Sequence, residues 1–148
     1  MASFNRGRNK YFTEIRETKM IEIKPQIADK KIKEISKDVI FDENTFVMCA
    51  KDKDEILGVG IIKLYEDYAL VDDIIFKDEY KMLGLDFSMG KAMLNFIERR
   101  NIYDTYASKK LNHQLLKSLR FVKNEGNFTE KYDFFLDLNG YFDVNCHF

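Results

Sequence analysis

The hydrophobic pattern of the chain changes its period once, near residue 77, and this change limits the folds that are open to it. Before that point, apolar and β-branched residues form three strand-like runs, at residues 45–50, 56–65 and 68–76, separated by short charged turns. Strands joined by such short turns pair in antiparallel order. Beyond it, apolar residues recur with helical spacing over residues 85–100. The sequence therefore predicts an antiparallel meander followed by an amphipathic helix.

Weaker patterns predict further elements on both sides of this centre. They are a strand at 19–24 ended by Pro25, a helix at 26–37 with Ile27, Ile32 and Ile35 on one face, a strand at 102–107, a helix marked by Leu111, Leu115 and Leu119, and strands at 121–123 and 132–138. A long helical connection between the strands at 68–76 and 102–107 makes these two strands parallel. The predicted fold class is therefore α+β, a mixed α/β arrangement around a mainly antiparallel sheet.

The length and composition predict one folded domain. A chain of 148 residues has room for a single core, with 45% apolar and 14% aromatic residues to fill it, and this composition excludes a disordered chain. We expect the domain to span residues 20–148. Residues 1–19 contain no apolar signal-peptide segment, and we expect them to form a partly disordered extension.

Charge, hydropathy and cysteine content narrow the range of partners. A net charge of −1 argues against nucleic-acid binding through a basic surface. The longest apolar run, residues 56–62, falls well short of the roughly 18 residues that a membrane span needs, so we expect no membrane partner. The two cysteines lack metal-type spacing, and the Cys146–His147 pair has one other histidine in the chain, so we expect no metal site and a cytoplasmic location.

Residues 70–86 form a motif at the change of period. A strand ends in an apolar residue, Asp78-Glu79-Tyr80 follows as a turn, and Lys81-x-x-Gly84-x-Asp86 leads into the long helix. This arrangement resembles the cofactor-binding motif of the GNAT N-acetyltransferases, in which a Pro-Glu-Tyr-like turn precedes Arg/Gln-x-x-Gly-x-Gly/Ala. Phe121 also falls where the family has a Gly-Phe pair, with Arg120 in place of the glycine. The order of predicted elements matches the family from about residue 20 to residue 138.

The resemblance implies a three-layer fold, with helices on both faces of the central sheet, and acetyl-CoA as cosubstrate. The helix N-terminus and the loop before it would bind the pyrophosphate through backbone N–H groups, which Gly84 lets approach closely. The backbone of the strand before the motif would pair with the pantetheine arm, in a V-shaped gap between the strands at 68–76 and 102–107, and a lysine after the second strand would offset nearby acids. The cofactor-binding residues implied are Ile74, Phe76, Lys81, Met82, Leu83, Gly84, Leu85, Asp86 and Lys109.

Acid–base residues follow less directly from the resemblance. Many family members carry an acid on the strand before the motif, and Asp73 is at the corresponding position, so it is the candidate general base. The tyrosine general acid of the family would fall near Leu116, which we interpret as a core residue. Tyr103 and Tyr106 are possible substitutes, and we take Tyr106 as the candidate acid. An acid is also dispensable, because a thiol with a pKa of about 8.5 can leave as a thiolate.

Two features near Gly84 have alternative interpretations. Residues 84–92 resemble a Walker-type phosphate loop, but the spacing is one residue too long and Ala92 stands where Ser or Thr would bind Mg²⁺. Gly90 is better explained by close packing of the helix on the sheet. Asp86 replaces the Gly or Ala of the family. Its carboxylate either favours the helix dipole, pointing away from the phosphates, or fills the anion site itself.

The resemblance implies an N-acetyltransferase that moves an acetyl group from acetyl-CoA to a primary amine by direct attack in a ternary complex. The alternative is a catalytically inactive domain of the same fold with a binding or regulatory role. A small molecule or a peptide would supply the amine, and self-association into a homodimer stays open. The region between the first two strands has space for one helix where the family usually has two, so the acceptor is not specified.

Overall fold

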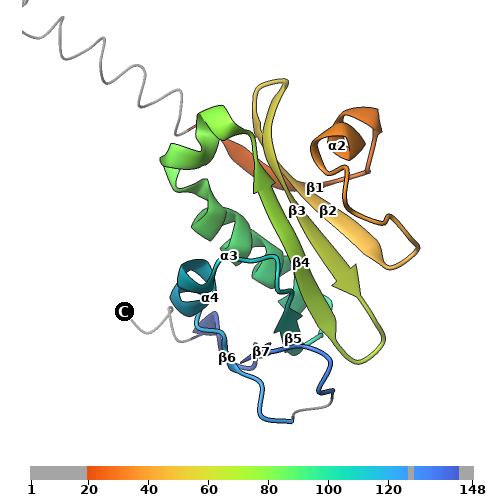
Figure 1. Ribbon diagram of the computed structural model, residues 1–148, viewed down its shortest axis with the longest axis vertical. Helices are drawn as coiled ribbons and strands as arrows, with labels where there is room; N and C mark the ends of the chain where they lie inside the picture. Colours follow the sequence, from red (N-terminus) through yellow and green to blue (C-terminus); the bar gives the residue numbers. More distant parts are fainter. Residues whose placement is uncertain (1–19, 127–128, 144–148) are drawn as a thin grey trace, which may run out of the picture.

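Seven strands form one mixed sheet in the computed structural model, which describes residues 20–126 and 129–143. The strand order is β1-β2-β3-β4-β5-β7-β6, and β4 and β5 are the one parallel pair among the described strands (Figure 1). The elements in chain order are β1 (Glu22–Gln26), α2 (Lys30–Ile35), β2 (Thr45–Asp52), β3 (Glu55–Leu64), β4 (Ala69–Phe76), the 3₁₀ helix η1 (Asp78–Leu83), α3 (Leu85–Glu98), β5 (Asp104–Ala107), α4 (His113–Ser118), β6 (Val122–Lys123) and β7 (Phe134–Asp137). The predicted fold class and element order are confirmed; the expected N-terminal extension and Cys146–His147 lie outside the described residues.

Helices cover both faces of the sheet, as predicted. On one face, Met89 and Met93 of α3 pack with Ile62 and Val71 in the larger hydrophobic cluster. On the other face, Ile32 of α2 packs on Val59 and Ile61 in a smaller cluster. The alternation of side chains along β3 therefore supplies both cores, which explains why eight of its ten residues are buried.

Two glycines allow neighbouring elements to approach closely. Gly60 does so between the sheet and α3, and Gly90 does so between α3 and the end of α4. A Cβ atom on Gly60 of β3 would lie 2.6 Å from the Met93 sulfur, so this glycine lets α3 approach the sheet. A Cβ atom on Gly90 of α3 would lie 2.6 Å from a methyl group of Leu119. The prediction that Gly90 packs on the sheet is wrong, because its neighbour is the C-terminal end of α4.

The first strand and helix differ from their predicted bounds. Pro25 does not end β1, which continues to Gln26. Since β1 pairs with β2 alone, it is an edge strand, where the missing N–H of a proline can be tolerated. The helix is correspondingly short and begins at Lys30, with the Asp29 carboxylate as its N-cap. Ile27 lies outside it and is 88% exposed, so the prediction of a shared face with Ile32 is wrong.

Strands β4 and β5 pair over only part of their length. Their parallel register covers Ala69 to Val71 on β4, and the Ser108 N–H donates to the Val71 carbonyl at the end of this stretch. The five remaining residues of β4, Asp72 to Phe76, continue beyond the last residue of β5. This half of β4 pairs with β3 on one side and with no described strand on the other. The divergence predicted for these two strands is confirmed.

Candidate active site

The unpaired half of β4 is a backbone edge inside the sheet. Its N–H and C=O groups on the β5 side have no strand partner among the described residues, because β5 ends at Ala107. Backbone groups of this kind are strong donors and acceptors, and an exposed strand edge can pair with an added extended chain. Ile74 on this edge is half-buried, and Phe76 at its end packs its ring against Gly58 of β3. The edge therefore combines backbone groups that have no strand partner on the β5 side with neighbouring apolar side chains.

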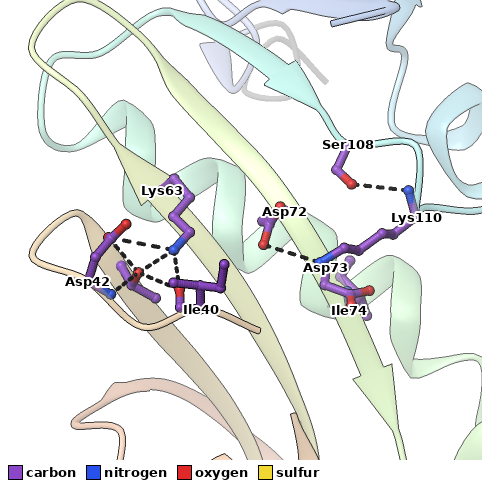
Figure 2. Close-up of polar contacts among 9 residues, drawn as sticks. Ile40, Asp42, Lys63, Asp72, Asp73, Ile74, Ser108 and Lys110 are labelled. Carbon is purple, nitrogen blue, oxygen red and sulfur yellow. Dashed lines mark hydrogen bonds and ion pairs between the residues drawn. The ribbon is translucent and has the colours of Figure 1, made fainter. Parts of the chain in front are cut away.

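A β-bulge marks the point where β4 leaves β5. The register with β3 shifts there, so that Ile61 lies opposite Asp73 while Ile62 lies opposite Val71, and Asp72 is the extra residue. The Asp72 side chain is 16% exposed, and its carboxylate lies 3.8 Å from the Lys110 ammonium. The backbone N–H of Lys110 in turn donates to the Ser108 hydroxyl at 3.0 Å (Figure 2). The loop after β5 is thus connected to β4 through side chains where the strands no longer pair.

Asp73, the candidate general base, follows the bulge directly. It lies opposite Ile61, on the α2 side of the sheet, and its carboxylate accepts the Ile74 N–H at 2.9 Å. Burial raises the pKa of this carboxyl above its ordinary value, and the charges of Asp72 and Asp38 add to the rise. The Ile74 N–H and the Lys110 ammonium lower the pKa, with a smaller effect than burial. Raised basicity is the property that a carboxylate base needs near neutral pH.

Tyr106, the candidate acid, is fully buried on β5. Its ring lies 5.6 Å from that of Tyr68 and 5.5 Å from that of Tyr132, centroid to centroid. Its hydroxyl has no partner with hydrogen-bond geometry among the described residues. Burial raises the pKa of this hydroxyl, and the nearby Thr129 backbone only partly offsets the rise. Tyr106 therefore holds its proton firmly, and its role in catalysis stays a prediction.

The other residues considered for the position of the proton donor have different surroundings. Leu116 is 1% exposed, which confirms it as a core residue. The Tyr103 hydroxyl donates to the side chain of Asn101 at 3.4 Å, at the start of β5 and away from Asp73 along the strand. The Tyr132 hydroxyl, which the sequence did not single out, has its pKa raised to about 12 by burial and by Tyr68.

The segment before α3 contains the helix η1, which the sequence did not predict. Gly84 joins the two helices with a φ of +69°, a left-handed conformation that favours glycine, and no heavy atom lies within 4 Å of the position its Cβ would occupy. Asp86 lies in the first turn of α3, where its carboxylate accepts the Phe87 N–H at 2.9 Å. Lys81 is paired with Asp78 at 2.8 Å, and Met82 is 96% exposed. Leu83 is also exposed and Leu85 is half-buried, so the predicted cofactor loop is open to solvent.

Lys109 and Lys110 diverge after β5. Lys109 is 81% exposed and its ammonium lies 3.9 Å from Asp133, beside β7. Its neighbour Lys110 contacts Asp72 of β4. The lysine that the structure places against β4 is therefore Lys110, one residue beyond the one that we selected from the sequence.

Lys63 is a further polar residue of this region that sequence reasoning missed. It is 8% exposed on β3, and its ammonium donates to the Ile40 carbonyl and the Thr45 hydroxyl, with the Asp42 carboxylate at 3.5 Å (Figure 2). These bonds tie the segment before β2 to the sheet, close to Asp73. The available signal in the sequence was that Lys63 directly follows the apolar run at residues 56–62 and precedes Leu64.

No group of three or more His, Cys, Asp or Glu side chains with metal-binding geometry occurs in the part of the chain that the structure describes. None of the described helices is both long enough and apolar enough to span a membrane.

Solved structures with a similar arrangement of elements include acetyltransferases. The dodecameric spermidine N-acetyltransferase of Vibrio cholerae aligns over 85% of this chain and 98% of its own, with a TM-score of 0.65 and 11% sequence identity. The ribosomal-protein-S18-alanine N-acetyltransferase of Escherichia coli aligns over 78% and 89%, with a TM-score of 0.58 and 14% identity. A GNAT family acetyltransferase of Elizabethkingia anophelis, solved with acetyl-CoA bound, aligns over 80% and 99%, with a TM-score of 0.56 and 13% identity.

The chain has the GNAT acetyltransferase fold. No protein-family model matches the sequence, and no curated protein matches it either. The GNAT fold thus persists here with a sequence far from those of the solved structures.

Proposed function

We propose that this protein transfers an acetyl group from acetyl-CoA to a primary amine, by direct attack of the amine within a ternary complex. The observation that supports this proposal most strongly is the unpaired backbone edge of β4 beside the half-buried carboxyl group of Asp73. An extended acyl donor on that edge would end next to a base. Both features lie on one strand, where the bulge at Asp72 separates the paired half from the open half.

The residues present fit an acyl-CoA donor at two places. Backbone groups from Asp72 to Phe76 can pair with the amides of an extended pantetheine arm, as a sheet edge pairs with an added strand. The start of α3 behind Gly84 offers the N–H groups of a helix N-terminus and leaves space beside the glycine. When bound, acetyl-CoA supplies the activated acyl group. The residues of the protein bind this donor and remove the proton from the amine.

Proton removal is the step that we assign to Asp73. An alkylammonium must lose a proton before its nitrogen can attack a carbonyl carbon. Asp73 would accept that proton, directly or through a water molecule, and the raised pKa of its carboxyl suits this role. The C–N bond then forms while the C–S bond breaks, and the sulfur leaves as a thiolate, since the parent thiol has a pKa of only about 8.5. The second proton, which the attacking nitrogen loses as the amide forms, passes to this thiolate or to water. Tyr106 as a proton donor to that sulfur is the less direct proposal, because its hydroxyl is buried.

The surroundings of Asp73 favour a cationic amine as acceptor. The two lysines of this region are already paired, Lys63 with Asp42 and Lys110 with Asp72. The half-buried rings of Tyr65 and Tyr68, stacked at 4.8 Å, flank the turn between β3 and β4, at the end of β4 away from Asp73. Carboxylates and aromatic faces both attract alkylammonium groups. The carboxylates that act on this region are Asp38, Asp42, Asp72 and Asp73. Among the similar structures, one is named for spermidine and another for an alanine residue of a protein, so a polyamine and a peptide amine are both candidate acceptors.

A binding or regulatory role without catalysis is the second candidate function. It is favoured by the carboxylate of Asp86 at the start of α3 and by Leu116, a core residue where the resemblance implies a catalytic tyrosine. Calorimetric titration with acetyl-CoA, combined with thiol release in the presence of diamines and of peptides with a free N-terminus, distinguishes the two functions. We expect saturable binding and amine-dependent thiol release. Binding without thiol release for any amine would favour the regulatory role, and absence of binding would contradict acyl-CoA as the ligand.

A further inference from the structure

The proposed donor site has two ends of opposite character. One end is the open half of β4, Asp72 to Phe76, whose backbone groups bind amides regardless of charge. The other is the segment Asp78 to Asp86, η1 and the start of α3, where a diphosphate would lie. This segment carries three carboxylates, Asp78, Glu79 and Asp86, against the single ammonium of Lys81. The net charge of these side chains therefore disfavours an anionic ligand at this second end.

The lysines on this segment and on its two neighbours have contacts of their own. Lys81 pairs with Asp78 at 2.8 Å. Lys91 of α3 lies over the ring of Tyr141 at 4.6 Å, over that of Phe142 at 5.4 Å and over that of Phe87, in the first turn of the helix, at 5.9 Å. Lys77, just before η1, lines a hollow on the opposite face with Ile35 of α2 and with Glu55. Each lysine would have to leave its present neighbours to neutralise a diphosphate there.

One N–H group of the helix start is already bonded to a carboxylate of the chain. The partial positive charge of a helix N-terminus attracts anions, which is why a diphosphate would bind there. In this protein the Asp86 carboxylate occupies the first turn and accepts the Phe87 N–H at 2.9 Å. A bound diphosphate would lie close to this carboxylate and would compete with it for the helix N-terminus.

We propose that this protein recognises its donor through the acylated pantetheine arm, with the nucleotide diphosphate of CoA contributing no net affinity. This inference rests on the proposed function and specifies the donor for it. Any thioester of pantetheine would then be a ligand, whether or not it carries the nucleotide. The part of the chain that discriminates against the nucleotide is the carboxylate of Asp86.

Calorimetric titration of the whole protein with acetyl-CoA and with S-acetylpantetheine tests this inference. We expect the two dissociation constants to agree within about threefold, because repulsion cancels the attraction of the helix start. Added salt screens that repulsion, so acetyl-CoA affinity should rise with salt while S-acetylpantetheine affinity stays constant. A donor held by favourable diphosphate contacts would show the opposite salt dependence.

Asp86→Asn isolates the charge, because the amide oxygen of asparagine can still accept the Phe87 N–H. Removing a like charge about 5 Å from a phosphate should tighten acetyl-CoA binding by about ten- to a hundredfold and leave S-acetylpantetheine binding unchanged. Asp86→Ser is the second variant, with a hydroxyl as acceptor at the same helix start, and thermal unfolding confirms that each variant is folded. Asp67→Asn, in the exposed turn at the other end of β4, removes the same charge far from η1 and should change neither affinity.

The outcomes separate this inference from the function on which it rests. Wild-type protein that binds acetyl-CoA more than tenfold tighter than S-acetylpantetheine, with no gain in Asp86→Asn, would overturn the inference and leave the acetyltransferase proposal standing. Failure of both donors to bind wild type and every variant would overturn the proposed function, and this inference with it.

Discussion

The two faces of the sheet are built from different kinds of residues. On the α3 face, the buried side chains contributed by β3, β4 and α3 are apolar, among them Ile62, Val71 and Leu94. On the α2 face, the same strands carry the buried ammonium of Lys63 and the half-buried carboxyl of Asp73 beside Ile61. Burying polar groups costs free energy unless each finds a partner, whereas apolar burial stabilises without such conditions. The α3 face therefore contributes to stability through apolar burial, while the α2 face holds the polar groups on which the proposed function depends.

Asp73→Asn gives the largest effect that we expect on the α2 face, and it acts on activity. Loss of a general base should lower the rate of acetyl transfer by about a hundred- to ten-thousandfold. Stability should move in the other direction. Because the pKa of Asp73 is raised on folding, its contribution favours the folded state at low pH and is lost as pH rises through the raised pKa, so a neutral asparagine is stabilising at neutral pH.

Acetylation rate and urea unfolding, measured across pH 3 to pH 8, check both parts. Asp67→Asn, a change of the same kind in the exposed turn at the other end of β4, serves as the control. A rate unchanged in Asp73→Asn would contradict the role of this residue as the base.

Leu94→Ala tests the other face. Leu94 is fully buried on α3, so its truncation removes apolar contacts and leaves a cavity that costs about 2–5 kcal/mol of unfolding free energy. Acetyl-CoA affinity of the molecules that remain folded should be unchanged. Urea unfolding monitored by circular dichroism gives the stability. A loss below about 1 kcal/mol would show that the α3 face is not the principal source of stability.

Lys63→Met breaks the polar connection on the α2 face while keeping the aliphatic stem. It leaves the Ile40 carbonyl and the Thr45 hydroxyl without their shared donor, and we expect a loss of about 1–3 kcal/mol. The matched control is Lys109→Met, whose ammonium is 81% exposed and 3.9 Å from Asp133, and it should cost no more than about 1 kcal/mol. Equal losses in the two variants would mean that burial of Lys63 has no special consequence.

Lys110→Met gives the smallest expected effect. Lys110 is 45% exposed, so losing its pair with Asp72 should change stability by less than about 1 kcal/mol. Lys110 lowers the pKa of Asp73, and its removal should therefore raise that pKa further. The acidic limb of the rate–pH profile should move to higher pH in the variant. A limb that stays in place would indicate that a group other than Asp73 titrates in that limb.

Much of the fold was predictable because secondary structure leaves a local trace. The apolar, β-branched runs along β3 and β4 and the period near 3.6 along α3 follow from the preferences of strands and helices, and they require only neighbouring residues. Leu116 was also identified as a core residue, and it is 1% exposed in the structure. The motif around Gly84 was also readable, because a left-handed turn before a helix favours glycine wherever it occurs.

The candidate site was predicted only in part, because its geometry depends on pairing between distant segments. Asp73 was singled out from its position before the motif, but the bulge at Asp72 that separates it from the paired half of β4 depends on the register with β3. Lys110 rather than Lys109 contacts β4, and a choice between adjacent residues depends on how the loop after β5 turns. Lys63 was missed because its partners lie 18 to 23 residues away in sequence.

The sequence by itself determined which segments are strands and helices, their order, and the helix start at Gly84, since each depends on side-chain spacing and backbone preference within a few residues. The tertiary structure alone decided that β4 and β5 part after Val71, that Ile27 is exposed, and that Gly90 meets Leu119. These features are contacts between segments that are far apart along the chain. Their energies depend on which surfaces meet, and residue periodicity does not specify that.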